Sequence, residues 1–300
     1  MLLDSYPLSL INGHENAMGV WEESSEFLGA NEMLASTFAR HFWAFRAIED
    51  LIPQTLENFG PGHFFPYTEA YSDLEVSFEL AAQGFYKSAL VTLRSFLELG
   101  LLGPYFAARR QEHVDAPPWL ASEQPTPKRS ELLRRLRQME HFETFDQAFD
   151  LVPRIRSTFD KLDGFAHTRG RRHSAWTLST SNVNTFAEDA LLTHLRLTQD
   201  SVRHVVITIL LTYPLGLCGL PLDDKFGLNG PVGGFLRYDH VQLIESIILA
   251  NEVAILREIA LHDSRAQEVV TEIHALPDIT PEELEVQSKE LNRFMKESST

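Results

Sequence analysis

The sequence predicts an all-α fold, a helical bundle with additional peripheral helices. Apolar residues recur at helical rather than alternating spacing through most of the chain, and the longer Gly/Pro-containing stretches fall between these runs. The 300 residues are 44% hydrophobic and 10% aromatic, which is enough for a sizeable core. We therefore expect a globular helical protein.

The helical spacing and the breaks between runs predict nine helices, the first with a kink near Pro53. Their ranges are 28–58, 67–83, 85–110, 128–139, 142–166, 186–213, 238–262, 264–275 and 281–297. Two of them begin with a T-x-x-E capping box, in which each of the two side chains accepts a hydrogen bond from the other residue's backbone N–H. These boxes are Thr185 with Glu188 and Thr280 with Glu283.

The breaks divide the chain into an N-terminal helical segment (1–66), a helical core (67–213) and a C-terminal part (214–300). The expected linkers are 112–127, 174–184 and 214–236. The last linker keeps many apolar residues, so we expect an ordered crossover that packs on the bundle together with the C-terminal helices. The final helix, 281–297, is polar at most positions and is expected to be peripheral.

Composition and termini limit the partners and the compartment. The formal net charge of −16 repels polyanions, so any contact with nucleic acid needs a local basic patch. The single cysteine, Cys218, cannot form an internal disulfide, and the N-terminus has no basic region before an apolar one. The aliphatic stretch from Val205 is broken by Pro214 before it could span a bilayer. We expect a cytoplasmic protein that does not enter a membrane.

The helix 85–110 carries a narrow charged stripe on an otherwise apolar surface. Lys87, Arg94 and Glu98 fall within about 40° of one another around the helix axis. A helix that is apolar nearly all round is buried, so the stripe faces a strip of solvent or an internal cleft. Arg94 and Glu98 are four residues apart, and the alternative to a functional site is a structural salt bridge.

Residues 128–173 reverse the sign of the charge, with eleven Lys/Arg against seven Asp/Glu. The densest part reads "GFAHTRGRRHSAW" at 164–176 and contains Arg169, Arg171, Arg172 and His173. Cations at a helix C-terminus are favoured by the helix dipole, which explains part of the cluster. The rest favours an anion or RNA-phosphate site, with Arg171, Arg172 and His173 as phosphate-binding candidates.

His167 lies in the same segment but has a different setting. It is at helical spacing from Asp163 and Asp160, so either carboxylate is expected to fix its tautomer. Such a histidine, flanked by Arg169, has the properties of a general acid/base beside a phosphate clamp. The alternative is a structural histidine at the helix C-terminus.

Other familiar sites are absent from the sequence. There is no H-E-x-x-H, no paired-cysteine zinc spacing, no Walker loop and no G-x-S-x-G. We expect no metal and no cofactor.

The stretches "FELAAQGFYKSALVTLRSFLEL" and "FDKLDGFAHTRG" resemble the two core hairpins of the HEPN-like proteins, a bacterial all-α superfamily. The resemblance covers about 67–110 and 142–213 and rests on the helix break at Gly84, the Arg94/Glu98 pair and the polar His/Arg loop. It implies a toxin or phage-defence protein, commonly dimeric, in many cases a metal-independent ribonuclease. The spacing departs from that of the nucleases, because Lys161 stands where their arginine would precede His167. Non-catalytic members fit the sequence equally.

These observations give two hypotheses of different class. In the first, an HEPN-like protein binds or cleaves RNA: His167 is the acid/base, Arg169 and Arg94 hold the phosphate, and Glu98 orients Arg94. In the second, a non-enzymatic helical scaffold has a structural Arg/His cluster. The partners considered are RNA, a protein such as an antitoxin, and a second copy of the chain. Convergence of His167, Arg169, Arg94 and Glu98 in one concave site would favour the first hypothesis, and dispersion the second.

Overall fold

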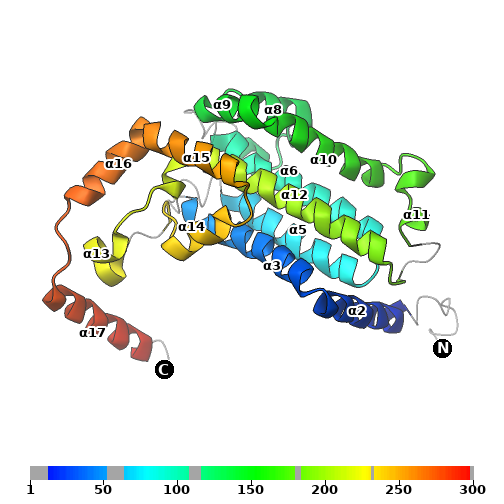
Figure 1. The fold of residues 1–300 in the computed structure, drawn as a ribbon, viewed down its shortest axis with the longest axis horizontal. Helices are drawn as coiled ribbons and strands as arrows, with labels where there is room; N and C mark the ends of the chain where they lie inside the picture. The colour runs from blue at the N-terminus through cyan, green and yellow to red at the C-terminus, as the bar shows by residue number, and fades with distance from the viewer. Residues whose placement is uncertain (1–12, 53–63, 108–115, 180–183, 231–232, 298–300) are drawn as a thin grey trace.

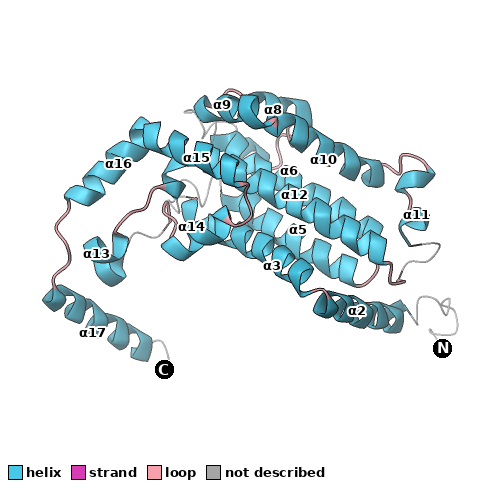
Figure 2. Cartoon of the chain, in the orientation of Figure 1, coloured by secondary structure: helices cyan, strands magenta, loops and turns pink. Residues whose placement is uncertain are grey.

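The computed structural model describes residues 13–52, 64–107, 116–179, 184–230 and 233–297. Every regular element in these ranges is a helix, and no strand is present among them (Figure 1; Figure 2). The prediction of an all-α helical bundle is therefore confirmed.

Five of the described helices form the centre of the bundle. They are α3 (Glu32–Ala47), α5 (Phe64–Ala82), α6 (Tyr86–Ala107), α10 (Leu151–Ala166) and α12 (Glu188–Thr212). α5 and α6 form a hairpin, α12 packs against α6 and α3, and α10 packs against α6 and α12. The hairpin turns at Gly84, whose φ of 80° is a left-handed conformation that glycine adopts without a steric penalty. The predicted helix break at this position is confirmed.

One large apolar cluster holds the bundle together. The rings of Phe45, Phe96, Phe142, Phe145 and Phe159 are fully or almost fully buried in it. Phe45 of α3 and Phe96 of α6 pack edge to face with their centroids 5.0 Å apart. The same cluster includes residues of the C-terminal helices, so the three segments predicted from the sequence share one core.

The described parts of the three expected linkers contain short helices. α7 (Ala116–Leu120) lies in the first and α11 (Ala175–Ser179) in the second, after the 3-10 turn η4 (Arg171–His173). The third holds η5 (Pro214–Leu217), α13 (Leu222–Phe226) and η6 (Gly227–Asn229). η5 packs against α15 (Ala250–His262), and the Phe235 N–H donates to the Asp50 carbonyl at 3.1 Å. The described residues of 214–236 thus contain short helices and contact the bundle.

Several predicted helix boundaries are wrong. The expected helix 142–166 is two helices, α9 (Glu140–Phe149) and α10, because Asp150 has a left-handed φ of 54°. The expected helix 238–262 divides into α14 (Tyr238–Glu245) and α15. The expected helix 28–58 is replaced by α2 (Gly13–Ala30), α3 and η2 (Ile48–Leu51), and the kink at Pro53 lies outside the described residues.

Other boundaries are confirmed. α8 (Arg129–Leu136) lies inside its expected range, and α16 (Ser264–Ala275) and α17 (Pro281–Glu297) have the predicted bounds. The Thr280–Glu283 capping box forms, with Glu283 N–H donating to Thr280 Oγ1 at 3.3 Å and Thr280 N–H donating to Glu283 Oε2 at 2.9 Å. The Thr185–Glu188 box is wrong, because α12 begins after Ala187, which provides no side-chain cap.

A buried ion pair connects the bundle to its C-terminal helices. The Arg154 guanidinium of α10 lies 2.6 Å from the carboxylate of Glu252 on α15, and Glu252 is fully buried. The other carboxylate oxygen of Glu252 accepts the Leu249 N–H at 3.2 Å, at the start of α15. α17, in contrast, lies apart from the bundle at the end of an extended connection, as predicted for a peripheral helix (Figure 1).

Candidate functional site

The charged stripe of α6 lies along the seam with α10. Arg94 Nε donates to Asp163 Oδ1 at 2.6 Å, and Arg94 Nη1 donates to Glu98 Oε2 at 2.9 Å. Two turns earlier, Lys87 Nζ donates to Thr168 Oγ1 at 2.7 Å. Lys87 is paired with Thr168, just after α10, and the later Arg94 is paired with the earlier Asp163, so the two helices run antiparallel. The stripe therefore faces a neighbouring helix at the edge of the bundle.

A second arginine reaches the same carboxylate from α8. Arg129 Nη1 donates to Asp163 Oδ2 at 3.1 Å and to Asp160 Oδ1 at 2.9 Å. Burial lowers the pKa of Arg94, but its hydrogen bonds and charge interactions with Asp163 and Glu98 together raise it by more. The net pKa is above the usual value, so Arg94 stays cationic. Two arginines meet three carboxylates here. Because the cluster already neutralises its own cations, it has little capacity to bind a phosphate.

His167 is at the C-terminal end of α10 and does not use these carboxylates. Its backbone N–H donates to the Asp163 carbonyl at 3.0 Å, while its exposed imidazole makes no hydrogen bond within the described residues. The expectation that Asp163 or Asp160 fixes the tautomer of His167 is therefore not met. Both carboxylates are bound to arginines instead.

The basic turn, residues 167–173, folds back over the end of α10. His173 Nδ1–H donates to the Arg169 carbonyl at 3.0 Å, and the His173 ring meets the Phe165 ring edge-on at 5.2 Å between centroids. The ring lies against Gly164, where an added Cβ would be only 2.3 Å from it. His173 thus acts as a packing residue in this turn.

The arginines of the basic turn point to solvent. Arg169, Arg171 and Arg172 are exposed and form no ion pair within the part of the chain that the structure describes. The backbone of the turn is fixed by Ser174 Oγ, which donates to the Arg171 carbonyl at 2.7 Å. Three unneutralised cations are therefore held on the same ordered turn that begins with the exposed His167.

The structure brings together some of the candidate residues and not others. Arg94 and Glu98 meet as the sequence indicated, but neither contacts His167 or Arg169 through a hydrogen bond or ion pair among the described residues. The four groups are therefore not in mutual hydrogen-bond contact, which counts against one catalytic site built from all four and favours a structural role for Arg94 and Glu98. Arg129, which completes the Arg94–Asp163 network, was missed because it lies 34 residues from Asp163.

Sequence reasoning also missed a pair between α9 and the α15–α16 junction. His141 Nε2 lies 2.7 Å from Asp263 Oδ2, across 122 positions of sequence. The spacing of the residues along the chain contains no signal for this pair. Two other histidines are buried in α12: His194 contacts Ser77 Oγ at 2.8 Å and His204 contacts Thr158 Oγ1 at 3.1 Å. Burial lowers the pKa of each to about 3.

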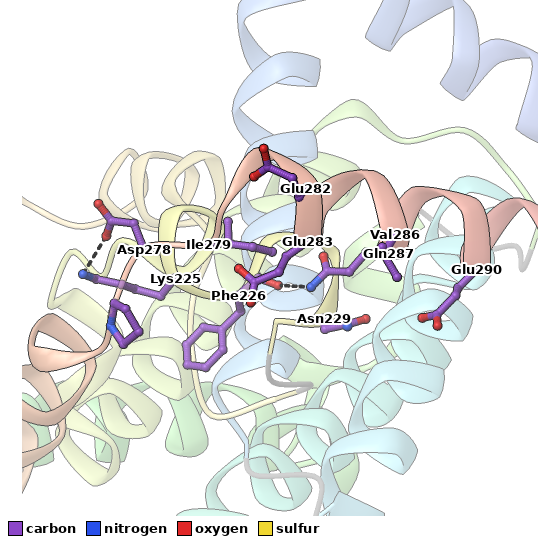
Figure 3. A pocket seen from close by; sticks show the side chains of 11 residues that line it. Lys225, Phe226, Asn229, Asp278, Ile279, Glu282, Glu283, Val286, Gln287 and Glu290 are labelled. Atoms are coloured by element: carbon purple, nitrogen blue, oxygen red, sulfur yellow. Dashed lines mark hydrogen bonds and ion pairs between the residues drawn. The ribbon is translucent and has the colours of Figure 1, made fainter.

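A groove of about 530 Å³ lies between α17 and residues 225–229 (Figure 3). Several of its polar groups attach α17 to the body: Lys225 Nζ contacts Asp278 Oδ1 at 2.7 Å, and Gln287 Nε2 donates to the Phe226 carbonyl at 3.0 Å. The Glu283 carboxylate is bound to Thr280 in the capping box. The groove is therefore best explained by the attachment of α17.

Within the described residues, no group of three or more His, Cys, Asp or Glu side chains is arranged to hold a metal ion. In the same part of the chain, no helix combines the length and apolarity needed to cross a bilayer. Comparisons of the chain with protein-family models, with curated proteins and with solved structures find no match.

Proposed function

We propose that this chain is an HEPN-like helical protein that binds RNA through its phosphates at the basic turn. One observation carries the proposal: Arg169, Arg171 and Arg172 are exposed and unpaired among the described residues, on a turn of fixed backbone. Arginine is well suited to bind phosphate oxygens through its several N–H groups. In a chain of net charge −16, such a local group of cations is needed for a polyanion to bind.

Binding is better supported than cleavage. Metal-free cleavage requires the acid/base and the cations to converge on one phosphate. His167 and Arg169 are two residues apart on the turn, but Arg94 is bound to Asp163 and Glu98. In a catalytic form of the proposal, His167 would be the acid/base and Arg169 would hold the phosphate. Arg94 would only hold α6 and α10 together, through Asp163. The setting that the HEPN-like resemblance suggests is a toxin or phage-defence system.

The binding test is fluorescence anisotropy with a labelled single-stranded RNA at increasing salt. Three phosphate contacts predict a slope of about −2 in log K against log salt concentration. The variant Arg169→Ala/Arg171→Ala/Arg172→Ala should lose most of the affinity and of this slope. The matched control is Arg134→Ala/Arg237→Ala/Arg257→Ala, which changes the net charge equally at arginines that contact carboxylates elsewhere. Equal losses in both variants would contradict the proposed site.

The cleavage test uses the same RNA on a denaturing gel, and expression of the protein in cells. If the wild-type protein leaves RNA intact and cells unharmed, and His167→Ala changes nothing, the ribonuclease form is wrong while binding can still hold. If RNA does not bind at all, the second hypothesis applies. The self-neutralised Arg94–Asp163–Arg129 cluster is the observation that favours it, because such a cluster fits a purely structural role.

A further inference from the structure

A cleft of about 710 Å³ lies between the start of α9, the end of α12 and the start of α16. This volume lies within the range of about 300–1,000 Å³ that small-molecule sites occupy in proteins. Its apolar lining comes from Leu51, Met139, Leu211, Leu215, Phe235 and Val269. We call it the α9–α16 cleft.

The His141–Asp263 pair lines this cleft. Asp263 Oδ2 accepts a hydrogen bond from His141 Nε2 at 2.7 Å, and Asp263 Oδ1 accepts one from the Ala266 N–H at 2.7 Å. Burial raises the pKa of Asp263, but the hydrogen bonds from His141 and Ala266 lower it more, so its net pKa is below the usual value. Asp263 is therefore an anion that keeps the proton on His141 Nε2.

The second nitrogen of His141 remains available. Within the described residues, His141 Nδ1 has no hydrogen-bond partner. This atom is also not buried away from solvent. A pair that served only to attach α9 to α16 would need neither this accessible nitrogen nor an open cleft beside it. The imidazole is thus oriented by Asp263, and Nδ1 is the ring nitrogen left open to a ligand.

The other charged groups around the cleft are few. Arg265 lines it, is exposed and forms no ion pair in the described part of the chain, while Glu140 is the opposing charge at its rim. The end of α12 contributes Thr212 and Tyr213 but no charged side chain. On the η5 side, burial and then the nearby Asp263 raise the pKa of Cys218, which keeps its thiol neutral. Because Asp263 is hydrogen-bonded by His141 and the Ala266 N–H and does not contact Arg265, Arg265 is the cation free to bind a ligand.

We propose that the α9–α16 cleft binds a small amphipathic anion. Its apolar body lies against Leu211, Leu215 and Phe235, and its carboxylate or phosphate is held by Arg265. The first turns of α9 and α16 line the same cleft; the N-terminus of α16 is already capped by Asp263, so only the dipole of α9 adds to the attraction for an anion. This proposal is independent of RNA binding at the basic turn.

The first test is a fluorescence titration with 8-anilinonaphthalene-1-sulfonate, which has an aromatic body and one anionic group. We expect saturable binding at one site per chain. Leu215→Trp fills the cleft and should weaken binding at least tenfold, whereas Leu261→Trp, at an exposed leucine outside the cleft, should not change it. Equal binding by the two variants, or no saturable binding by the wild-type protein, overturns the proposal.

The second test addresses the anionic group. Arg265→Gln should weaken binding about tenfold, and Arg196→Gln, at an exposed arginine near the far end of α12, should leave it unchanged. Equal weakening by Arg265→Gln and Arg196→Gln overturns the assignment of Arg265.

Competition identifies the anionic group. Octanoate, octyl phosphate and 1-octanol share one apolar body and differ only at the polar end. Displacement of the dye by octanoate rather than octyl phosphate identifies a carboxylate ligand, and the reverse identifies a phosphate ligand. Displacement by octanol as strong as by either anion overturns the proposal. Arg265 is exposed, so Arg265→Gln keeps the proposal testable if Leu215→Trp fails to fold.

Discussion

Replacing Glu252 by alanine tests whether the buried ion pair holds the C-terminal helices on the bundle. Removing one partner of a buried pair costs about 3–5 kcal/mol. The Arg154 side chain is 30% exposed and can recover some hydration, which favours the lower end, about 3 kcal/mol. Loss of the bond that caps α15 at Leu249 adds about 1 kcal/mol. We expect Glu252→Ala to lower the free energy of unfolding by about 4 kcal/mol.

Urea unfolding followed by circular dichroism measures this difference. Glu252→Gln is the matched variant: its amide oxygen can still accept the Leu249 N–H, so we expect a smaller loss, about 2 kcal/mol. The double variant Arg154→Met/Glu252→Leu removes both charges and should recover most of the stability. A loss below about 1 kcal/mol for Glu252→Ala would refute the reasoning, because a fully buried carboxylate would then contribute nothing to docking.

Three further predictions concern groups already described. The pKa of His204 is about 3 in the folded protein and near 6.5 in the unfolded chain, so between these values the unfolded state binds one more proton. The stability that the neutral ring contributes is therefore fully present above pH 6.5 and is lost as the pH falls toward 3. The free energies of unfolding from urea titrations at pH 7 and 5 should differ by about 2 kcal/mol more in the wild-type protein than in His204→Gln. Gly164→Ala should displace the basic turn and speed tryptic cleavage there, and a second change, His173→Ala, should restore resistance by making room for the methyl group. Asp163→Asn should lower the free energy of unfolding by about 2 kcal/mol in urea titrations, because two arginines lose their shared charge; an unchanged midpoint would mean that the network is not stabilising.

The fold class could be predicted because helical periodicity is a local signal that the packed bundle preserves. The bounds of α16 and α17 agree with the prediction. At the start of α17 the deciding interaction is local, because Thr280 caps the helix through Glu283, three residues away. The break at Asp150 was not predicted, because an aspartate in a left-handed conformation leaves the apolar pattern on both sides intact. Secondary structure was therefore most predictable where one local interaction decides it.

The candidate site shows the opposite case. The Arg94–Glu98 contact was evident from the four-residue spacing on one helix. Asp163 was assigned to His167 by an equally good four-residue spacing, but it binds Arg94 across the seam. The spacing along α10 cannot distinguish these partners, because the choice depends on which helix packs beside it. The His141–Asp263 pair was beyond sequence reasoning for the same reason.

The attachment of α17 has a consequence for how the molecule opens. Its hydrogen bonds to the body run through the short stretch 224–228, and its outer surface is exposed along its length. Local opening free energies are low where few buried contacts must break, and they approach the global value in the core. Amides of α17 should therefore exchange with deuterium through a separate, low-energy opening, while those at the centre of α6 exchange only when the whole chain unfolds. α17, which is seventeen residues long, would then unfold as a cooperative unit separate from the bundle.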